Sequence, residues 1–88
     1  MKLIIAIVPD INNDDVSNAL TSSNFKVTCI ASTGGLLRRG NSTLLIGLEN
    51  EKVETALEII RENTSSGPQG DEHRGVVFVL DVDEYIQI

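Results

Sequence analysis

The chain has 88 residues, a formal net charge of −6 and three aromatic side chains, which are Phe25, Phe78 and Tyr85. This length predicts one domain over residues 1–88, with a modest core that must rest on Ile, Leu and Val. The acidic balance excludes long nucleic acids as partners, because binding them requires many phosphate contacts. The single cysteine, Cys29, excludes an internal disulfide framework.

The charge is distributed unevenly along the chain. Residues 1–48 carry four basic and three acidic side chains, whereas residues 49–88 carry three basic and ten acidic ones. Because the local charge around residues 26–39 is positive, a small phosphorylated ligand remains compatible with the first half of the chain.

The N-terminal apolar run covers Leu3 to Val8 and is ended by Pro9. It is too short for the apolar region of a signal peptide or for a membrane span. We therefore expect a cytoplasmic protein with no membrane partner. A continuous apolar run of this length is typical of a strand covered on both faces.

The first helix is predicted to begin at Asn12 or Asn13, either of which can cap its free N–H groups. Asp14 and Asp15 fall in its first turn, where the helix dipole favours negative charge. Its predicted buried stripe, spaced i, i+3, i+4 and i+7, consists of Val16, Ala19, Leu20 and Ser23.

A second strand is predicted over residues 25–32, where apolar residues alternate with more polar ones. Lys26 and Thr28 share its more polar face, and Asn24 precedes them. Cys29 lies on the opposite face, and we interpret it as a small core residue.

The segment from Thr33 to Thr43, T-G-G-L-L-R-R-G-N-S-T, joins this strand to the next one. Its glycines allow positive φ and close approach to backbone N–H groups. Arg38 and Arg39 supply forked positive charge that suits phosphate oxygens. With Lys26, they favour a site for an anionic, phosphate-bearing ligand. A plain connector, with glycine for the turn and arginine for solubility, explains the same residues and remains open.

The third strand is predicted from Thr43 to Leu48, and Asn50 can cap the helix that follows. Gly, Pro and Ser make residues 63–75 a loop, and residues 76–80 form a last, fully apolar strand. The predicted buried stripe of the second helix consists of Val53, Ala56, Leu57 and Ile60.

The order of elements is therefore βαββαβ. With short connections and right-handed crossovers, it predicts an α+β, ferredoxin-like fold, in which one antiparallel four-stranded sheet carries two helices on one face. The other face of the sheet is then open although its residues are apolar. We expect the chain to self-associate through that face.

Residues for catalysis or metal binding do not form a recognisable group. His73 lies beside Asp71 and Glu72 with no nucleophile nearby, and a metal site needs several well-spaced ligands. The carboxylates near the C-terminus, Asp81 and Asp83 among them, are interpreted as solvent-facing or interface charges. We therefore expect no enzyme and no metal site. A small hydrolase on the same scaffold would need a positioned nucleophile, which fold alone cannot supply.

Three stretches of the chain, residues 1–10, 23–47 and 76–88, resemble the PII-like cyclic-di-AMP receptor proteins of Gram-positive bacteria, within the nitrogen regulatory PII superfamily. The specific motifs are T-G-G-x-L-R-x-G-N-[ST]-T and, near the C-terminus, V-D-x-[FY]-x-Q. The resemblance implies the ferredoxin-like fold, assembled as a PII-like trimer with ligand sites at the clefts between subunits.

The resemblance also implies a ligand-binding set. Thr28 and backbone amides would donate to phosphates, Asn24 and Gln87 would read adenine edges, and the pair Leu36-Leu37 would pack on a base. Lys26 stands where the family usually has arginine, Leu36 stands where it usually has an aromatic residue, and the 63–75 loop is shorter. The full set is Asn24, Lys26, Thr28, Gly35, Leu36, Leu37, Asn41, Gly47 and Gln87, to which the charge argument adds Arg38.

The leading hypothesis is a non-enzymatic sensor that binds cyclic di-AMP or a related nucleotide as its ligand, without a cofactor. It would pass its state to a partner protein through the loops 33–41 and 63–75. The alternative is a PII-like regulator that binds ATP or ADP, or that acts only by protein–protein contact.

Overall fold

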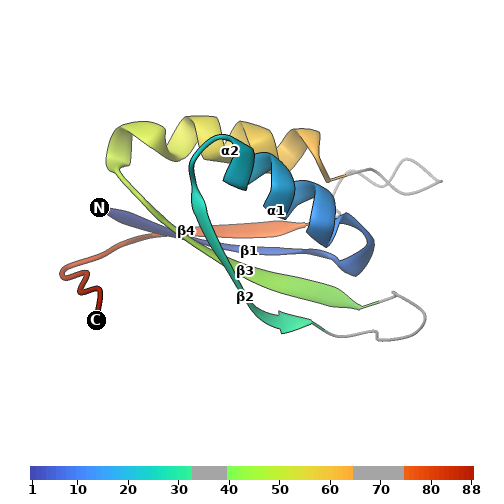
Figure 1. Cartoon of the computed structure of the whole chain (residues 1–88), viewed down its shortest axis with the longest axis horizontal. Coiled ribbons are helices and arrows are strands. Elements are labelled where there is room, and N and C mark those ends of the chain that lie inside the picture. Colours follow the sequence, from blue (N-terminus) through green and yellow to red (C-terminus); the bar gives the residue numbers. More distant parts are fainter. Residues whose placement is uncertain (33–39, 65–74) are drawn as a thin grey trace.

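Figure 1 shows the computed structural model of the chain, which describes residues 1–32, 40–64 and 75–88. One sheet of four strands has the order β2-β3-β1-β4, and every neighbouring pair is antiparallel. The predicted βαββαβ order and ferredoxin-like fold are confirmed. The elements are β1 (Lys2–Pro9), α1 (Asn13–Ser22), β2 (Lys26–Ser32), β3 (Asn41–Leu48), α2 (Val53–Glu62) and β4 (Val76–Asp81).

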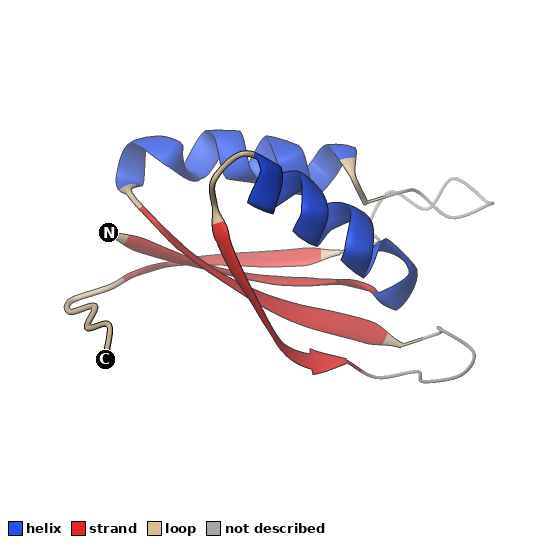
Figure 2. Ribbon diagram, viewed as in Figure 1, coloured by secondary structure: helices blue, strands red, loops and turns tan. Residues whose placement is uncertain are grey.

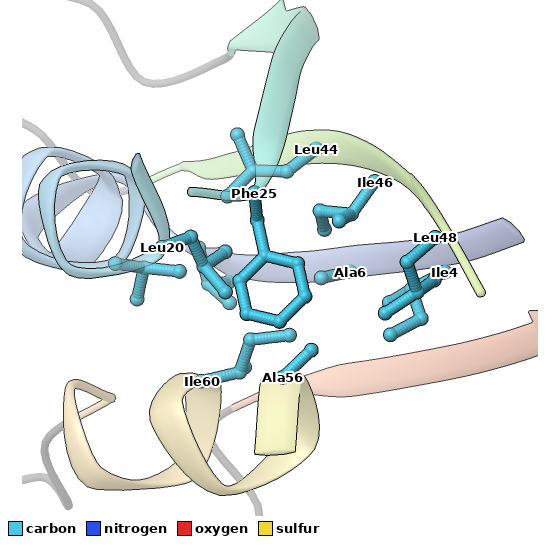
Figure 3. Packing of buried hydrophobic residues seen from close by; sticks show 11 residues of the cluster. Ile4, Ala6, Leu20, Phe25, Leu44, Ile46, Leu48, Ala56 and Ile60 are labelled. Carbon is cyan, nitrogen blue, oxygen red and sulfur yellow. The ribbon is translucent and has the colours of Figure 1, made fainter. Parts of the chain in front are cut away.

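Both helices cover the same face of the sheet (Figure 2). The core lies between these two layers, where alternate residues of β1 and β3 meet the apolar stripes of α1 and α2 (Figure 3). Each Ile or Leu fully buried here stabilises the fold by about 1.5–3 kcal/mol. The buried hydrophobic residues are Ile4, Ala6, Val8, Val16, Leu20, Phe25, Leu44, Ile46, Leu48, Ala56 and Ile60.

The two helical stripes follow the predictions closely. In α2, Ala56 and Ile60 are buried, and Val53 and Leu57 are half-buried against the core. The stripe of α1 is shorter than predicted, because Ser23 lies beyond the last helical residue and is exposed.

The helix starts differ from the prediction. A 3₁₀ turn precedes each helix, at Asp10–Asn12 before α1 and at Asn50–Lys52 before α2. Asn12 does occupy the position before α1, but no side-chain hydrogen bond caps either helix. Asn50 is not a cap at all, since it lies inside the 3₁₀ turn. Backbone groups close this turn instead, through the N–H of Lys52, which donates to the carbonyl oxygen of Glu49 at 3.0 Å.

The second face of the sheet carries apolar side chains without a covering layer in the described part of the chain. Leu3, Ile5 and Ile7 of β1 point to this face and are half-buried, so the prediction that β1 is covered on both faces is wrong for the single chain. On β4, Phe78 and Leu80 are 52% and 45% exposed. We call this surface, formed by Leu3, Ile5, Ile7, Leu45, Val76, Phe78 and Leu80, the open face.

In residues 1–32, 40–64 and 75–88, no helix has the length and apolar character needed to cross a membrane.

Candidate functional site

Two polar candidates of β2 lie on the open-face side of the sheet. Val27 packs against the core, so Lys26 and Thr28 on either side of it point the other way. Lys26 is directly opposite Gly47 of β3, and Thr28 is directly opposite Leu45. Both polar side chains are exposed, and the prediction that they share one face is confirmed.

The rows of paired residues continue from this polar edge across the sheet. Gly47 pairs with Leu3, which pairs in turn with Leu80 of β4. The next row runs from Thr28 through Leu45 to Ile5 and Phe78. A positive charge and a hydroxyl group therefore border an apolar surface, which suits a ligand with both phosphate and aromatic groups.

Gly47 is exposed in the interior of a strand, where glycine is ordinarily unfavourable. Among the described residues, a Cβ atom built at this position would meet one atom within 4 Å, the methyl carbon Cε of Met1, at 3.4 Å. Packing of the single chain therefore does not require glycine here. A residue without a side chain leaves the β3 backbone accessible beside Lys26, as close approach by a ligand would require.

Asn24 is held at the entrance to β2 by the end of α1. It has a φ of 71°, in the left-handed region that asparagine tolerates. Its N–H donates to the carbonyl oxygen of Thr21 at 3.0 Å, and the N–H of Phe25 donates to that of Leu20 at 3.0 Å. This is the Schellman arrangement, in which Phe25 and Leu20 also share the core. The helix end thus fixes the backbone of Asn24 two residues before Lys26 and leaves its side chain exposed.

Asn41 lies at the opposite end of β3. It pairs with Pro9 of β1 and is exposed. Gly47 is six positions further along the strand, which is a distance of about 20 Å. Within one chain, Asn41 therefore cannot contact the same small group as Lys26.

Sequence reasoning missed two polar residues beside Asn41. Asp10 and Ser42 are buried, and the Ser42 hydroxyl group donates to the Asp10 carboxylate at 2.5 Å. The partners are 32 residues apart in the sequence, so no local pattern could have revealed them.

Gln87 belongs to the C-terminal segment that follows β4. This segment leaves the sheet beside the first residues of β1, where the N–H of Val82 donates to the carbonyl oxygen of Met1 at 3.1 Å. Lys2 forms an ion pair with Asp81 at the same place, and the hydrogen bond and charge of Lys2 lower the pKa of Asp81. Gln87 itself is exposed.

The family model for the cyclic-di-AMP receptor matches residues 1–69 of this chain. The chain belongs to the cyclic-di-AMP receptor family. A crystal structure of a functionally unknown protein from Pediococcus pentosaceus ATCC 25745 is 34% identical, with a TM-score of 0.78. That similarity covers 99% of this chain and 96% of the other, so it extends over the C-terminal segment that the family match does not reach.

The structure gathers some of the ligand contacts that the receptor resemblance implies and separates others. Asn24, Lys26 and Gly47 lie at one end of the β2–β3 pair, and Thr28 lies one row further along. Asn41 lies at the far end. The remaining predicted residues of the glycine-arginine segment, Gly35, Leu36, Leu37 and Arg38, lie outside the described residues.

Two further predictions concern chemistry unrelated to receptor binding. Cys29 pairs with Leu44 on the helix side of the sheet, as predicted, but it is exposed and so is not a core residue. The reason is that β2 is an edge strand of the sheet.

Over the described ranges, no three His, Cys, Asp or Glu side chains form a group that could hold a metal ion. His73 lies outside those ranges.

Proposed function

We propose that this chain is a non-enzymatic sensor, working in the cytoplasm as a single domain, that binds cyclic di-AMP at clefts between its subunits. Membership of the cyclic-di-AMP receptor family supports the ligand. The observation that carries the proposal is the pairing of Lys26 with Gly47, next to Thr28, at the border of the open face.

The chemistry of this border matches a cyclic dinucleotide. The ammonium group of Lys26 can neutralise a phosphate as a point charge, and the Thr28 hydroxyl group can donate a hydrogen bond to a second phosphate oxygen. The β3 backbone at Gly47 is accessible to the ligand, and Leu45 offers an apolar contact for a base. The Asn24 side chain is available to pair with an adenine edge.

Self-association through the open face supplies the second wall of the cleft. Val76, Phe78 and Leu80 form an exposed apolar row on β4, and exposed apolar patches of this kind mark interaction surfaces. We propose that copies of the same chain cover it, in the trimer that the family resemblance implies. Sedimentation equilibrium should then give three times the chain mass of 9.5 kDa, whereas the mass of one chain would contradict the assembly.

The ligand is tested by isothermal titration calorimetry with cyclic di-AMP on the wild-type protein. Lys26→Met keeps the length of the side chain and removes its charge, and it should raise the Kd about tenfold, as expected for loss of a charge-assisted hydrogen bond. Lys52→Met is the matched control, because Lys52 is exposed in the 3₁₀ turn that precedes α2. No heat with wild-type protein, or equal effects of the two variants, would contradict the proposed site.

Experiments on the wild-type protein can also distinguish binding of cyclic di-AMP from binding of the alternative ligands. Because Lys26 offers one point charge rather than a bidentate fork, it is also compatible with the phosphates of ATP or ADP. Thermal shifts against a panel of nucleotides distinguish the two. Stabilisation by ATP or ADP and not by cyclic di-AMP would favour the alternative regulator, and no stabilisation by any nucleotide would favour action through protein contact alone.

We propose that bound ligand is signalled to a partner protein through the connections 33–41 and 63–75. A ligand shifts only those conformations that it binds with different affinity. Lys26 and Thr28 lie on the strand that leads into the first of these connections, and Asn41 begins the strand that leaves it.

A further inference from the structure

The described part of the chain buries three polar side chains, and all three lie just after the end of β1 or at the start of β3. Asp10 is 7% exposed, Asn12 is 5% exposed and Ser42 is fully buried. Asp10 and Asn12 belong to the 3₁₀ turn after β1, and Ser42 is the second residue of β3. The predicted ligand contact Asn41 lies directly beside this cluster in the sequence.

Asp10 holds β3 on both sides of Asn41. Its backbone N–H donates to the carbonyl oxygen of Gly40 at 2.9 Å. Its carboxylate accepts a hydrogen bond from the Ser42 hydroxyl group at 2.5 Å. One residue of the 3₁₀ turn therefore fixes the residue before Asn41 and the residue after it.

Pro9 lies opposite Asn41 in the β1–β3 ladder. Hydrogen-bonded and non-hydrogen-bonded pairs alternate along an antiparallel ladder, and the N–H of the next residue, Asp10, donates to the carbonyl oxygen of Gly40. The Pro9–Asn41 pair is therefore a non-hydrogen-bonded pair, at which the missing N–H of proline costs the ladder nothing. Asn41 is thus held by a clamp on its neighbours, the Asp10–Gly40 bond on one side and the Asp10–Ser42 bond on the other.

Stability alone is a weak explanation for a carboxylate and a hydroxyl group at this position. Burying polar groups carries a desolvation penalty that their hydrogen bond only partly offsets. The neighbouring pair, Ala6 with Leu44, is apolar and fully buried, so apolar side chains are compatible with the same layer. The hydrogen bond between Ser42 and Asp10 instead fixes the position of the first residues of β3 relative to the turn after β1. Since Ser42 points toward the helix layer, Asn41 is directed to the opposite side of the sheet.

We propose that Asp10 and Ser42 are positioning residues for ligand binding, which fix the start of β3 so that Asn41 is presented to the nucleotide. This inference rests on the proposed function, because it assigns Asn41 a ligand. Neither residue contacts the ligand in this proposal. They act through the backbone of residues 40–42.

The test compares Ser42→Ala, Asp10→Ala and Asp10→Asn by calorimetric titration with cyclic di-AMP. The two alanine variants should raise the Kd about tenfold, the loss expected when a buried polar group is left without its partner. Asp10→Asn keeps an amide oxygen that can accept from Ser42, so it should restore most of the affinity. Ile60→Val is the matched control, because it removes one methyl group from the core on α2 and lowers stability without touching this cluster.

Hydrogen exchange of the Asp10 amide, measured without nucleotide, reports the clamp directly. Ser42→Ala should accelerate this exchange, whereas Ile60→Val at equal loss of Tm should not. The inference is overturned if Ser42→Ala folds and binds like wild type, or if Ile60→Val raises the Kd as much. If wild-type protein binds no cyclic di-AMP, the proposed function fails and the positioning role fails with it. Unchanged affinity of Ser42→Ala beside a binding wild type defeats the positioning role alone.

Discussion

Replacing Gly47 by alanine should strengthen the fold and weaken ligand binding. The added methyl group would lie on the side of β3 that carries the pairing with Lys26. Among the described residues, its one neighbour within 4 Å is the flexible Cε atom of Met1, at 3.4 Å. Because the end of a methionine side chain can move by a few tenths of an ångström, the single chain accommodates the substitution.

The expected magnitudes have opposite signs. A glycine in the interior of a strand costs about 0.5–1 kcal/mol relative to alanine, so the free energy of unfolding should rise by about that amount. For a domain of this size, such a gain corresponds to about 2–8 °C in Tm. A ligand packed against the β3 backbone would meet the new methyl group, and overpacking of this kind costs about 1–3 kcal/mol, or roughly a five- to 160-fold rise in Kd.

The assay combines thermal unfolding without nucleotide and calorimetric titration with cyclic di-AMP on one preparation of each variant. Gly75→Ala is the contrasting control. A Cβ atom there would lie 3.1 Å from the carbonyl oxygen of Ile7, which is backbone and cannot easily move. Gly75→Ala should therefore lose stability and keep its affinity. If Gly47→Ala binds like wild type, the ligand does not approach this strand, and if its Tm falls, the glycine has a structural role instead.

Four more substitutions test separate parts of the reasoning. Asn24→Gly keeps the left-handed backbone that closes α1, so its Tm should match wild type while its Kd for cyclic di-AMP rises severalfold. Asn24→Ala should lose both stability and affinity. Unchanged affinity of Asn24→Gly would mean that the Asn24 side chain does not contact the ligand. Lys26→Arg should lower the Kd, because a guanidinium group binds phosphate with two donors, and unchanged affinity in calorimetry would place residue 26 outside the pocket. Phe78→Asp puts a charge on the open face, at a side chain that is 52% exposed in the single chain. Sedimentation should therefore show monomers, and their circular dichroism spectrum should retain the helical signal. An intact trimer would refute assembly through the open face. The hydrogen bond and charge of Lys2 lower the pKa of Asp81 from 3.8. The stabilisation from this pair is therefore complete above the ordinary pKa and is lost as the pH falls through the lowered pKa. Asp81→Asn should remove that part of the acid dependence of Tm, and an unchanged profile of Tm against pH would mean that the pair contributes nothing to stability.

The sequence predicts most of the fold because its apolar spacing is local information. The stripe that includes Ala56 and Ile60 and the alternation around Val27 depend only on the repeat of a helix or strand. The same spacing cannot tell which strands lie at the sheet edges. Cys29 was assigned the correct side of its strand and the wrong burial for that reason, since β2 has a neighbour on one side alone.

The candidate site was predicted less completely than the fold. Lys26 and Thr28 could be placed on one face from their spacing, but their pairing with Gly47 and Leu45 depends on the register of two strands. The burial of Asp10 depends on Ser42, which is 32 residues away. The Asn50 cap failed because backbone hydrogen bonds in a 3₁₀ turn satisfied the groups that the side chain was expected to meet. Such non-local and competing interactions leave no periodic signal.

In the proposed function, the location of Lys26 and Thr28 would link ligand binding to assembly. These residues belong to an edge strand, while the most exposed apolar row, on β4, lies at the other edge of the sheet. In the proposed assembly, a second copy that covers the apolar rows of β1 and β4 would end near the polar border and form a cleft there, with one wall from each chain. A ligand that contacts both walls binds the assembled form more tightly than the separated chains, so it must stabilise the assembly by the same factor. Added ligand should therefore shift the protein towards the assembled form, and dilution that separates the chains should weaken the apparent affinity.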